Sequence, residues 1–247
     1  MTGEPVITIR GVSKQFYFDT HRSNSLREWF IRRVLRRRVP PPPVAFSIAD
    51  MDLCMRRGES VALVGRNGSG KSTLLRLIAG IYRPTTGHVS CNGSLAAVLE
   101  LGAGFHDELT GKDNVAVYAA ALGFDRRDLA ERYGEIVRFA DIGDVLDKPI
   151  KHYSTGMRAR LALGVALCME PDILLMDEAL SVGDRLFRRK VYDRLERFQE
   201  RGGTLVLVSH DLELLQQFCR RVIWLREGRI EADGDAKAIL EMYHQAK

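Results

Sequence analysis

The sequence has no run of about eighteen consecutive apolar residues, the length that a helix needs to cross a bilayer. We therefore expect no membrane-spanning helix in these 247 residues. The first residues, MTGEPVITIRG, lack a basic stretch followed by an apolar one, so we expect no signal peptide. Internal repeats and heptad patterns are also lacking, which argues against a repeat array or a coiled coil.

Cysteine is scarce, and its four positions, 54, 91, 168 and 219, lie far apart in the sequence. No two of them form a C-x-x-C pair, so we expect neither a zinc site nor a disulfide framework. Reduced thiols in a cytosolic protein are the expectation that remains.

Excess basic charge is lacking outside one segment. The net charge is +5, but residues 21–43 hold seven Arg and one Glu, which leaves the other residues at −1. This distribution argues against a general nucleic-acid-binding surface. The basic segment ends in four prolines at 40–43, which predict a stiff, extended spacer.

Strands and helices are expected to alternate along the chain. We expect strands over 5–18, 46–55, 60–65, 172–177, 204–210 and 222–228, and two short strands within 87–101 around the turn Asn92-Gly93. Helices are expected after residue 70, from Thr110 to about Ile142 with N-caps at Thr110 and Asp125, after Gly156, over about 184–201, after residue 210 and from about Asp235. This order predicts an α/β fold with a mostly parallel sheet flanked by helices. The alternating N-terminal strands predict a smaller antiparallel β layer.

One motif predicts a phosphate-binding loop. GRNGSGKS, Gly65 to Ser72, fits G-x-x-x-x-G-K-[ST] between an apolar strand and a helix, as a P-loop requires. The glycines let the backbone wrap phosphate oxygens, Lys71 reaches the β- and γ-phosphates, and Ser72 is a candidate Mg²⁺ ligand. The candidate nucleotide-binding residues here are Gly65, Asn67, Gly68, Ser69, Gly70, Lys71, Ser72 and Thr73.

Two further strands end in residues suited to hydrolysis. ILLMDEA ends in Asp177, a candidate Mg²⁺ ligand, and Glu178, which would orient or deprotonate the attacking water. LVSHD places His210 where it would donate a hydrogen bond to the γ-phosphate. A structural turn is the alternative for His210. The candidate catalytic residues are thus Lys71, Glu178 and His210.

A second anion-binding helix start follows at residues 154–156. Ser154 and Gly156 open an apolar helix, and the bare N–H groups of such a start attract an anion. With the P-loop, the strand-end Asp-Glu and the strand-end His, this order resembles the ATP-binding subunit of ABC transporters over nearly the whole chain. The resemblance implies that Ser154 and Gly156 bind the γ-phosphate of ATP held by another subunit, so that two chains close head to tail around two ATP.

The signature region departs from the family pattern. The family sequence is L-S-G-G-Q, and here it is Tyr153-Ser154-Thr155-Gly156-Met157, without the first glycine and the glutamine. YSTGMRARLALGVA, DEALSVGD and ELGAGFHDELTGKDNV look like the branch that exports O-antigen, capsule or teichoic acid. That branch implies a separate integral membrane partner in two copies, a lipid-linked polysaccharide substrate, and a peripheral position on the cytoplasmic face of the bacterial inner membrane.

The resemblance also assigns roles to three further sites. Phe16 or Tyr17 would stack on adenine, and we favour Phe16. The lid glutamine of the family, which senses Mg²⁺, has no clear equivalent: Glu100 is the nearest polar candidate and Leu101 the alternative by spacing. The loop LSVGD, 180–184, would contact the second subunit.

The resemblance implies one ABC nucleotide-binding domain over 1–247. Within it we expect a basic, Pro-rich insertion at 21–43, a helical subdomain with the signature loop at about 100–165, and a C-terminal strand and helix at about 225–247. The chain ends 37 residues after His210, so we expect no C-terminal sugar-binding β-sandwich.

Three alternatives for the function of the chain stay open: an ABC exporter subunit for another substrate, a soluble ABC-type ATPase of DNA repair or translation, or a P-loop kinase or GTPase.

The segment 21–38 also has two interpretations. A helix there would carry an apolar stripe of Leu26, Phe30 and Val34 beside arginines, which suits a membrane surface or the membrane partner. The alternative is a solvated insertion.

Overall fold

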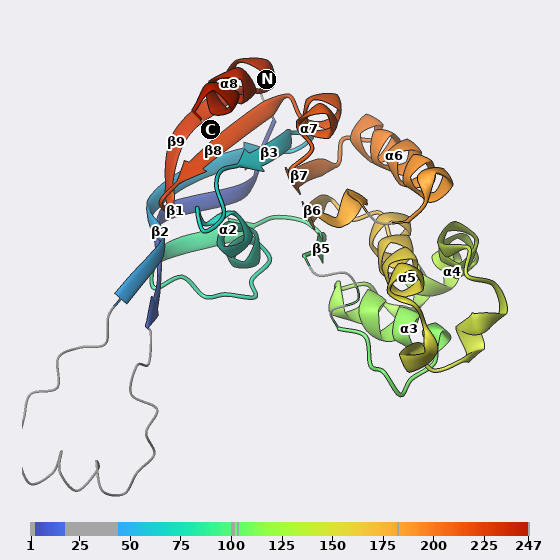
Figure 1. Cartoon of the computed structure of the whole chain (residues 1–247). Helices are drawn as coiled ribbons and strands as arrows, with labels where there is room; N and C mark the ends of the chain where they lie inside the picture. Colours follow the sequence, from blue (N-terminus) through green and yellow to red (C-terminus); the bar gives the residue numbers. More distant parts are fainter. Residues whose placement is uncertain (1–2, 18–43, 100–101, 103, 182, 247) are drawn as a thin grey trace, which may run out of the picture.

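The computed structural model describes residues 3–17, 44–99, 102, 104–181 and 183–246 (Figure 1). The basic segment 21–43 lies outside the described residues, as do Glu100 and Leu101. The expectations for these positions therefore stay predictions.

The main sheet is six-stranded and mostly parallel, as expected. Its strands follow the order β5 (Leu95–Val98), β6 (Ile173–Asp177), β7 (Thr204–Val208), β3 (Ser60–Val64), β8 (Arg221–Arg226) and β9 (Arg229–Asp235). Neighbours are parallel except β8 and β9, which pair antiparallel. Every residue of β3 and β7 is buried, because helices or the second sheet cover both faces.

The expected antiparallel layer is also present. It consists of β2 (Val44–Arg56), β1 (Pro5–Tyr17) and β4 (Thr86–Cys91), with β1 in the middle. Apolar side chains from β1 and β2 pack with β3 and with the helix α2 (Lys71–Ile78) in one buried cluster. The antiparallel layer thus supports the loop between β3 and α2.

The two short strands expected around Asn92-Gly93 are present as β4 and β5, but they do not pair with each other. β4 pairs with β1 in one sheet, whereas β5 pairs with β6 in the other. Asp172 accepts hydrogen bonds from the Ser94 N–H and hydroxyl, both at 2.9 Å, and the Ser94 carbonyl accepts from the N–H of Ile173. These contacts pull the chain toward β6, so pairing with a distant strand overrides the local turn preference.

The helices fall into two groups. α2, α6 (Arg185–Glu200), α7 (Leu212–Phe218) and α8 (Ala236–Gln245) pack on the sheets, and α3 (Gly111–Ala121), α4 (Arg126–Ala140) and α5 (Thr155–Cys168) form a helical part with its own apolar cluster. Short 3₁₀ turns are η1 (Gly143–Asp147), η2 (Ile150–His152) and η3 (Ala179–Ser181). The N-caps are confirmed: Thr110 accepts from the N–H of Asp113, and Asp125 forms a capping box.

The end of the chain holds a strand that the sequence did not resolve. We expected the strand over 222–228 and then the last helix, but β9 forms a hairpin with β8 in between. Its sequence RIEADGD alternates half-buried and exposed residues, and few of them are apolar, so the period-two signal is weak. None of the helices in the described residues is long and apolar enough to span a membrane.

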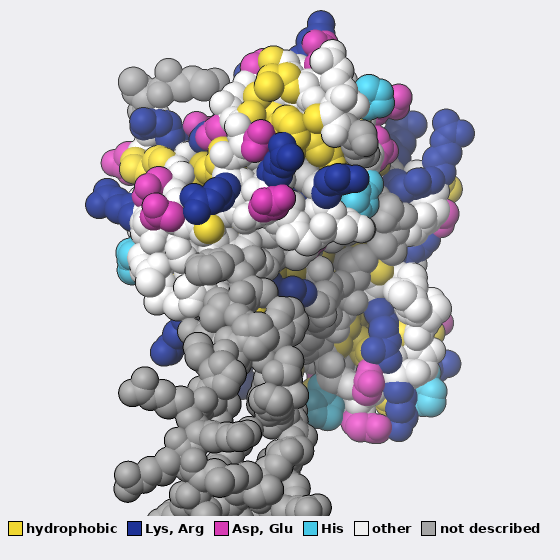
Figure 2. All heavy atoms as spheres, turned by 60° about the vertical axis from the view of Figure 1, so that its left-hand side comes forward, with side chains coloured by type: hydrophobic (Ala, Val, Ile, Leu, Met, Phe, Trp, Pro, Cys, Tyr) yellow, Lys and Arg dark blue, Asp and Glu magenta, His cyan; other side chains and the backbone are white. Residues whose placement is uncertain are grey.

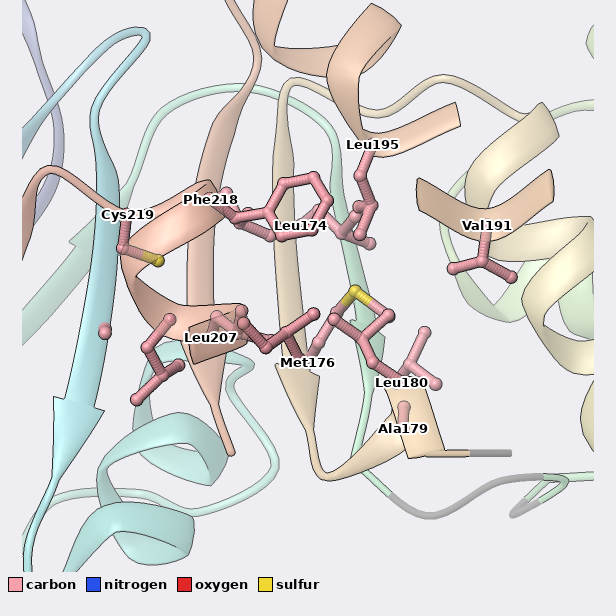
Figure 3. Packing of buried hydrophobic residues seen from close by; sticks show 14 of the residues in the cluster. Leu174, Met176, Ala179, Leu180, Val191, Leu195, Leu207, Phe218 and Cys219 are labelled. Atoms are coloured by element: carbon pink, nitrogen blue, oxygen red, sulfur yellow. The ribbon is translucent and has the colours of Figure 1, made fainter. Parts of the chain in front are cut away.

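The core of the main sheet joins the strands to α6. Figure 3 shows Leu174 and Met176 of β6 pointing toward α6, where Val191 and Leu195 lie. All four side chains are buried.

On the outside, Figure 2 shows Lys and Arg side chains mixed with Asp and Glu, and an apolar area between them near the top. The coloured part of that face therefore has no single sign of charge.

Candidate nucleotide-binding site

The P-loop follows β3 and opens α2, as the motif predicts. Gly70 is the N-cap of α2 with φ 106°, and Gly65 and Gly68 also have positive φ. A Cβ on Gly70 would lie 2.5 Å from the Ser47 carbonyl oxygen and 2.9 Å from Ile48 Cδ1. Glycine is therefore required there by the chain's own fold.

Lys71 lies across the mouth of this loop. Its ammonium donates hydrogen bonds to the carbonyl oxygens of Gly65, at 2.8 Å, and Arg66, at 3.1 Å. Burial lowers the pKa of Lys71, while the nearby carboxylates of Asp177 and Glu178 oppose this shift. The first turn of α2 carries no acidic residue, so its N–H groups and Lys71 together favour an anion.

The other loop side chains divide into exposed and engaged ones. Asn67 is exposed and Ser69 is buried. The Ser69 hydroxyl has no hydrogen-bond partner among the described residues. The Thr73 hydroxyl bonds to the Ser47 hydroxyl at 2.7 Å, which ties α2 to β2. Thr73 thus makes a hydrogen bond to β2 that the sequence did not predict.

The ends of β6 and β7 bring the predicted hydrolytic residues together. Asp177 closes β6, and its carboxylate accepts a hydrogen bond from the Ser72 hydroxyl of α2. Glu178 follows in a left-handed conformation, φ 51°, and its N–H donates to the Val208 carbonyl at 2.9 Å. The side chain of His210 then meets it, with 2.9 Å between His210 Nε2 and Glu178 Oε1.

The contact between Glu178 and His210 is an exposed one. Their side chains are 54% and 61% exposed, and ion pairs at such exposure contribute little to stability. The contact places the His210 imidazole beside a carboxylate that also acts electrostatically on Lys71 and Asp177. The sequence predicted that these residues share one end of the sheet, and the structure places them there.

One aromatic side chain at this site was missed. A small cavity behind the P-loop is lined by Gly65, Lys71, Ser209, His210 and, from α8, Tyr243. The Tyr243 ring packs edge-on against Trp224 of β8, with centroids 5.6 Å apart. In the sequence, Tyr243 is only an aromatic residue of an amphipathic helix, and no local pattern connects it to the P-loop.

The second anion-binding helix start lies apart from the first. Ser154 is the N-cap of α5, and its hydroxyl accepts from the N–H of Met157 at 3.2 Å. A Cβ on Gly156 would meet only the Ser154 hydroxyl, at 3.8 Å. The first turn of α5 carries no acidic residue. In Figure 1, α5 belongs to the helical part and α2 to the part built on the sheets.

Known proteins share this arrangement and its sequence. Residues 48–181, more than half of the chain, match the family described as "ABC transporter". This chain belongs to the ABC transporter family. Its members that carry these motifs bind and hydrolyse ATP, so the site described above is that of an ABC ATPase.

Two relatives resemble the chain over much of its length. The O-antigen export system ATP-binding protein RfbB of Klebsiella pneumoniae is 38% identical over 98% of this chain and 99% of its own length. The teichoic acids export ATP-binding protein TagH of Staphylococcus haemolyticus is 36% identical over 81% of this chain and 75% of its own length.

Solved ABC structures share the fold. One described as the ATP binding subunit of an ABC transporter has a TM-score of 0.75 at 22% identity and covers 97% of this chain and 93% of its own. The ATP-binding cassette MJ0796, a dimer bound to ADP and Pi, has a TM-score of 0.73 at 21% identity and covers 93% of this chain and 98% of its own. At these identities the likeness concerns the fold alone.

The aromatic candidate for adenine has contacts within this ABC ATPase. The Phe16 ring packs edge-on against Tyr82, with centroids 5.5 Å apart, and Lys14 Nζ lies 5.2 Å from its centroid. Phe16 is half-buried, so part of its surface stays available. Stacking of Phe16 on adenine remains a prediction, and the side chain of Tyr17 lies outside the described part of the chain.

The oxygen atoms at the end of β6 suit Mg²⁺. The described residues contain no cluster of three or more His, Cys, Asp or Glu side chains that could hold a metal. Mg²⁺ does not need one beside a nucleotide, because it keeps several waters and takes phosphate oxygens. The Ser72 hydroxyl and the Asp177 carboxylate, already in contact, are hard oxygen ligands of the kind that it prefers.

A charged Asp177 lowers the free energy of unfolding, and this effect can be measured. Burial, with a contribution from Glu178, raises the pKa of Asp177, although the Ser72 hydrogen bond opposes the shift. The folded state thus binds a proton more readily than the unfolded state, so stability falls as pH rises from the ordinary Asp value through the raised one. We predict that Asp177→Asn increases the free energy of unfolding at neutral pH and abolishes Mg²⁺-dependent ATP hydrolysis. Urea unfolding and an ATPase assay measure the two effects.

The control for this prediction has the opposite sign. The hydrogen bonds of Asp172 to Arg57 and Ser94 lower the pKa of its carboxyl. Asp172→Asn should therefore lose stability at neutral pH, with a smaller difference from the wild type in acid. A loss of stability in Asp177→Asn similar to that in Asp172→Asn would contradict the burial argument.

Proposed function

We propose that residues 1–247 form one nucleotide-binding subunit that binds Mg-ATP, dimerises head to tail around two ATP and powers export of a lipid-linked surface polysaccharide. The observation that carries the dimer is Gly156, a glycine at an anion-binding helix start where the chain's own fold leaves room for a side chain. Support for the substrate class is the likeness to O-antigen and teichoic acid export proteins over most of the chain.

The proposal includes a membrane partner. The subunit would act at the cytoplasmic face of the bacterial inner membrane, bound to two copies of a separate channel-forming subunit, and would not bind nucleic acid. An ABC exporter subunit for another substrate is the second candidate, because the ATPase motifs are common to all of them. The charge distribution, with −1 outside residues 21–43, favours neither nucleic acid nor a general acidic partner.

ATP binding would use the P-loop of the same chain. The N–H groups at the start of α2 would face the phosphates, and the Lys71 ammonium would leave the carbonyl oxygens of Gly65 and Arg66 for the β- and γ-phosphates. Ser72 and Asp177 would hold Mg²⁺, which when bound neutralises phosphate charge. Phe16 would contact the adenine.

Hydrolysis would depend on the pair at the ends of β6 and β7. Glu178 would accept a hydrogen bond from the attacking water and take its proton. His210, which contacts Glu178 Oε1 at 2.9 Å, would hold that carboxylate in place and donate to the γ-phosphate once ATP is present. Ser154 and the N–H groups near Gly156 would complete the site from the second subunit, so neither chain would hydrolyse ATP alone.

Loss of the general base should trap the closed dimer. We predict that Glu178→Gln binds Mg-ATP normally, loses about 10²-fold or more in turnover, and forms a stable dimer in Mg-ATP. The amide keeps the shape of the side chain but does not take the proton. Sedimentation velocity with Mg-ATP and with Mg-ADP measures the dimer. A Glu178→Gln protein that stays monomeric in Mg-ATP at high protein concentration would contradict the head-to-tail dimer.

Complementation should show that the two anion sites belong to different chains. We predict that Gly156→Asp and Lys71→Ala each lose hydrolysis, by about 10²-fold, because each disrupts both sites of a homodimer. Mixed, the two defects fall in one composite site and leave the other intact, so activity should return in part. The Gly156→Asp monomer should keep the ATP affinity of the wild type, as should Gly156→Ala, which the local fold accommodates. Loss of ATP affinity in the Gly156→Asp monomer would mean that the loop acts on its own chain's nucleotide.

The substrate class is tested in cells. We predict that deletion of the gene stops the appearance of surface polysaccharide and leaves its lipid-linked form inside the cell. In the deletion strain, the wild-type gene should restore export and the Lys71→Ala variant should not. Glycan immunoblots of surface and inner-membrane fractions measure both pools. Normal surface polysaccharide in the deletion strain, with a changed level of another exported compound, would favour the second candidate.

A further inference from the structure

A four-residue link joins two functional parts of this ATPase. α5, which starts with the signature loop, ends at Cys168, and β6, which ends with Asp177, starts at Ile173. The start of α5 and the end of β6 are therefore the two far ends of one bent unit, and residues 169–172 are its corner. In the proposed dimer these far ends serve two different nucleotides.

Glu170, in this corner, has a backbone conformation that suits another residue. It directly follows Met169, the C-cap of α5, and has φ 53°. This position after a helix is most often glycine, because only glycine adopts the left-handed conformation without steric cost. We therefore expect the side chain of this glutamate to make contacts that offset the backbone cost.

The Glu170 carboxylate is the meeting point of three arginines. Its Oε2 lies 2.8 Å from Arg132 of α4 and 2.8 Å from Arg201, which follows α6, and its Oε1 lies 3.5 Å from Arg194 of α6. We call these three arginines and Glu170 the corner clamp. Glu135 of α4 adds a second carboxylate, 2.7 Å from Arg194.

The same arginines also hold the backbone on both sides of Glu170. Arg132 donates to the Cys168 carbonyl at 3.1 Å, and Arg194 donates to the Leu167 carbonyl at 3.3 Å, at the end of α5. Arg201 donates to the Pro171 carbonyl at 3.1 Å, just before β6. The corner clamp thus connects the helical part of the molecule to the part built on the main sheet.

A small rotation at this corner has a large effect at the signature loop. α5 has 14 residues. At 1.5 Å per residue it is about 21 Å long, so a rotation of about 10° at Glu170 would move its start by about 4 Å. That displacement exceeds a hydrogen-bond length and would take Ser154 and Gly156 out of reach of a phosphate.

We propose that Glu170 is a positioning residue, which holds α5 at the angle to β6 that closure of the ATP-bound dimer requires. The inference rests on the proposed function, since it concerns the same dimer. Without Glu170, Arg194 would keep its contact with Glu135, and Arg132 and Arg201 would each lose their ion pair at 2.8 Å. Burial already lowers the pKa of Arg201, and Arg194 and Arg132 add to that effect, so their repulsion would act directly on the corner.

The first test separates dimer closure from nucleotide binding. In the Glu178→Gln background, Glu170→Gln should keep the ATP affinity of the monomer within about twofold and weaken ATP-driven dimerisation by about tenfold or more. Without the Glu178 change, its KM for ATP should stay near the wild-type value, and its turnover should rise with protein concentration. A general loss of folding would lower monomer ATP affinity as well.

Two further variants are matched to this one. Glu131→Gln removes an exposed Arg–Glu pair of α4, with Arg127, that does not touch the link, and it should dimerise like its parent. Arg132→Lys keeps a positive charge beside Glu170 but replaces the planar guanidinium, whose Nη1 contacts both Glu170 and the Cys168 carbonyl, so its defect should be smaller and of the same kind. Equal dimerisation of Glu170→Gln and Glu131→Gln would overturn the inference.

A distance measurement tests the corner clamp without the dimer. Spin labels on Cys54 and on a Thr155→Cys variant, with Cys91→Ser, report the position of the start of α5 relative to β2. In the nucleotide-free monomer, Glu170→Gln should shift or broaden this distance by about 4 Å, as a rotation of about 10° at the corner would. If Glu178→Gln itself never dimerises, the proposed dimer is wrong. The distance distribution then tests the role of Glu170 by itself, and an unchanged distribution would overturn that role.

Discussion

The parallel pairing of β6, β7 and β3 is the constraint on which the site depends. Asp177 lies opposite Val208, and Val208 lies opposite Leu63, so the three strands end at one level of the sheet. Parallel strands send their following loops to the same edge, which is where open α/β sheets bind ligands. The P-loop, Glu178 and His210 meet for this reason, although about 110 to 145 residues separate the first from the other two.

Placing charge at that edge works against stability. Lys71 and Asp177 are each partly buried, and burial shifts the pKa of each toward its neutral form. Their mutual attraction offsets only part of this cost. Phosphate oxygens and Mg²⁺ would supply the missing partners, which is consistent with a site that is most stable when occupied.

The sequence predicted the parts of this structure that local chemistry decides. P-loop glycines, strand-end acids and N-caps such as Thr110 depend on a few neighbouring residues, and all are in place. What the sequence did not show depends on distant contacts: β4 and β5 join different sheets, where Ser94 bonds to Asp172, and Tyr243 reaches the P-loop cavity from the last helix. The arginines around Glu170 come from α4 and α6, so no spacing in the sequence shows that they meet.

Two glycines show how a site shared between chains can be recognised in one chain. Gly70 is needed by its own fold, because a Cβ there would collide with the Ser47 carbonyl and Ile48. Gly156 is not, because a Cβ there would meet only the Ser154 hydroxyl, at 3.8 Å. The backbone at Gly156 is therefore open to close approach by another molecule. In the proposed dimer this molecule would be a phosphate carried by a second chain, because the adjacent helix start attracts anions and lies apart from the chain's own P-loop.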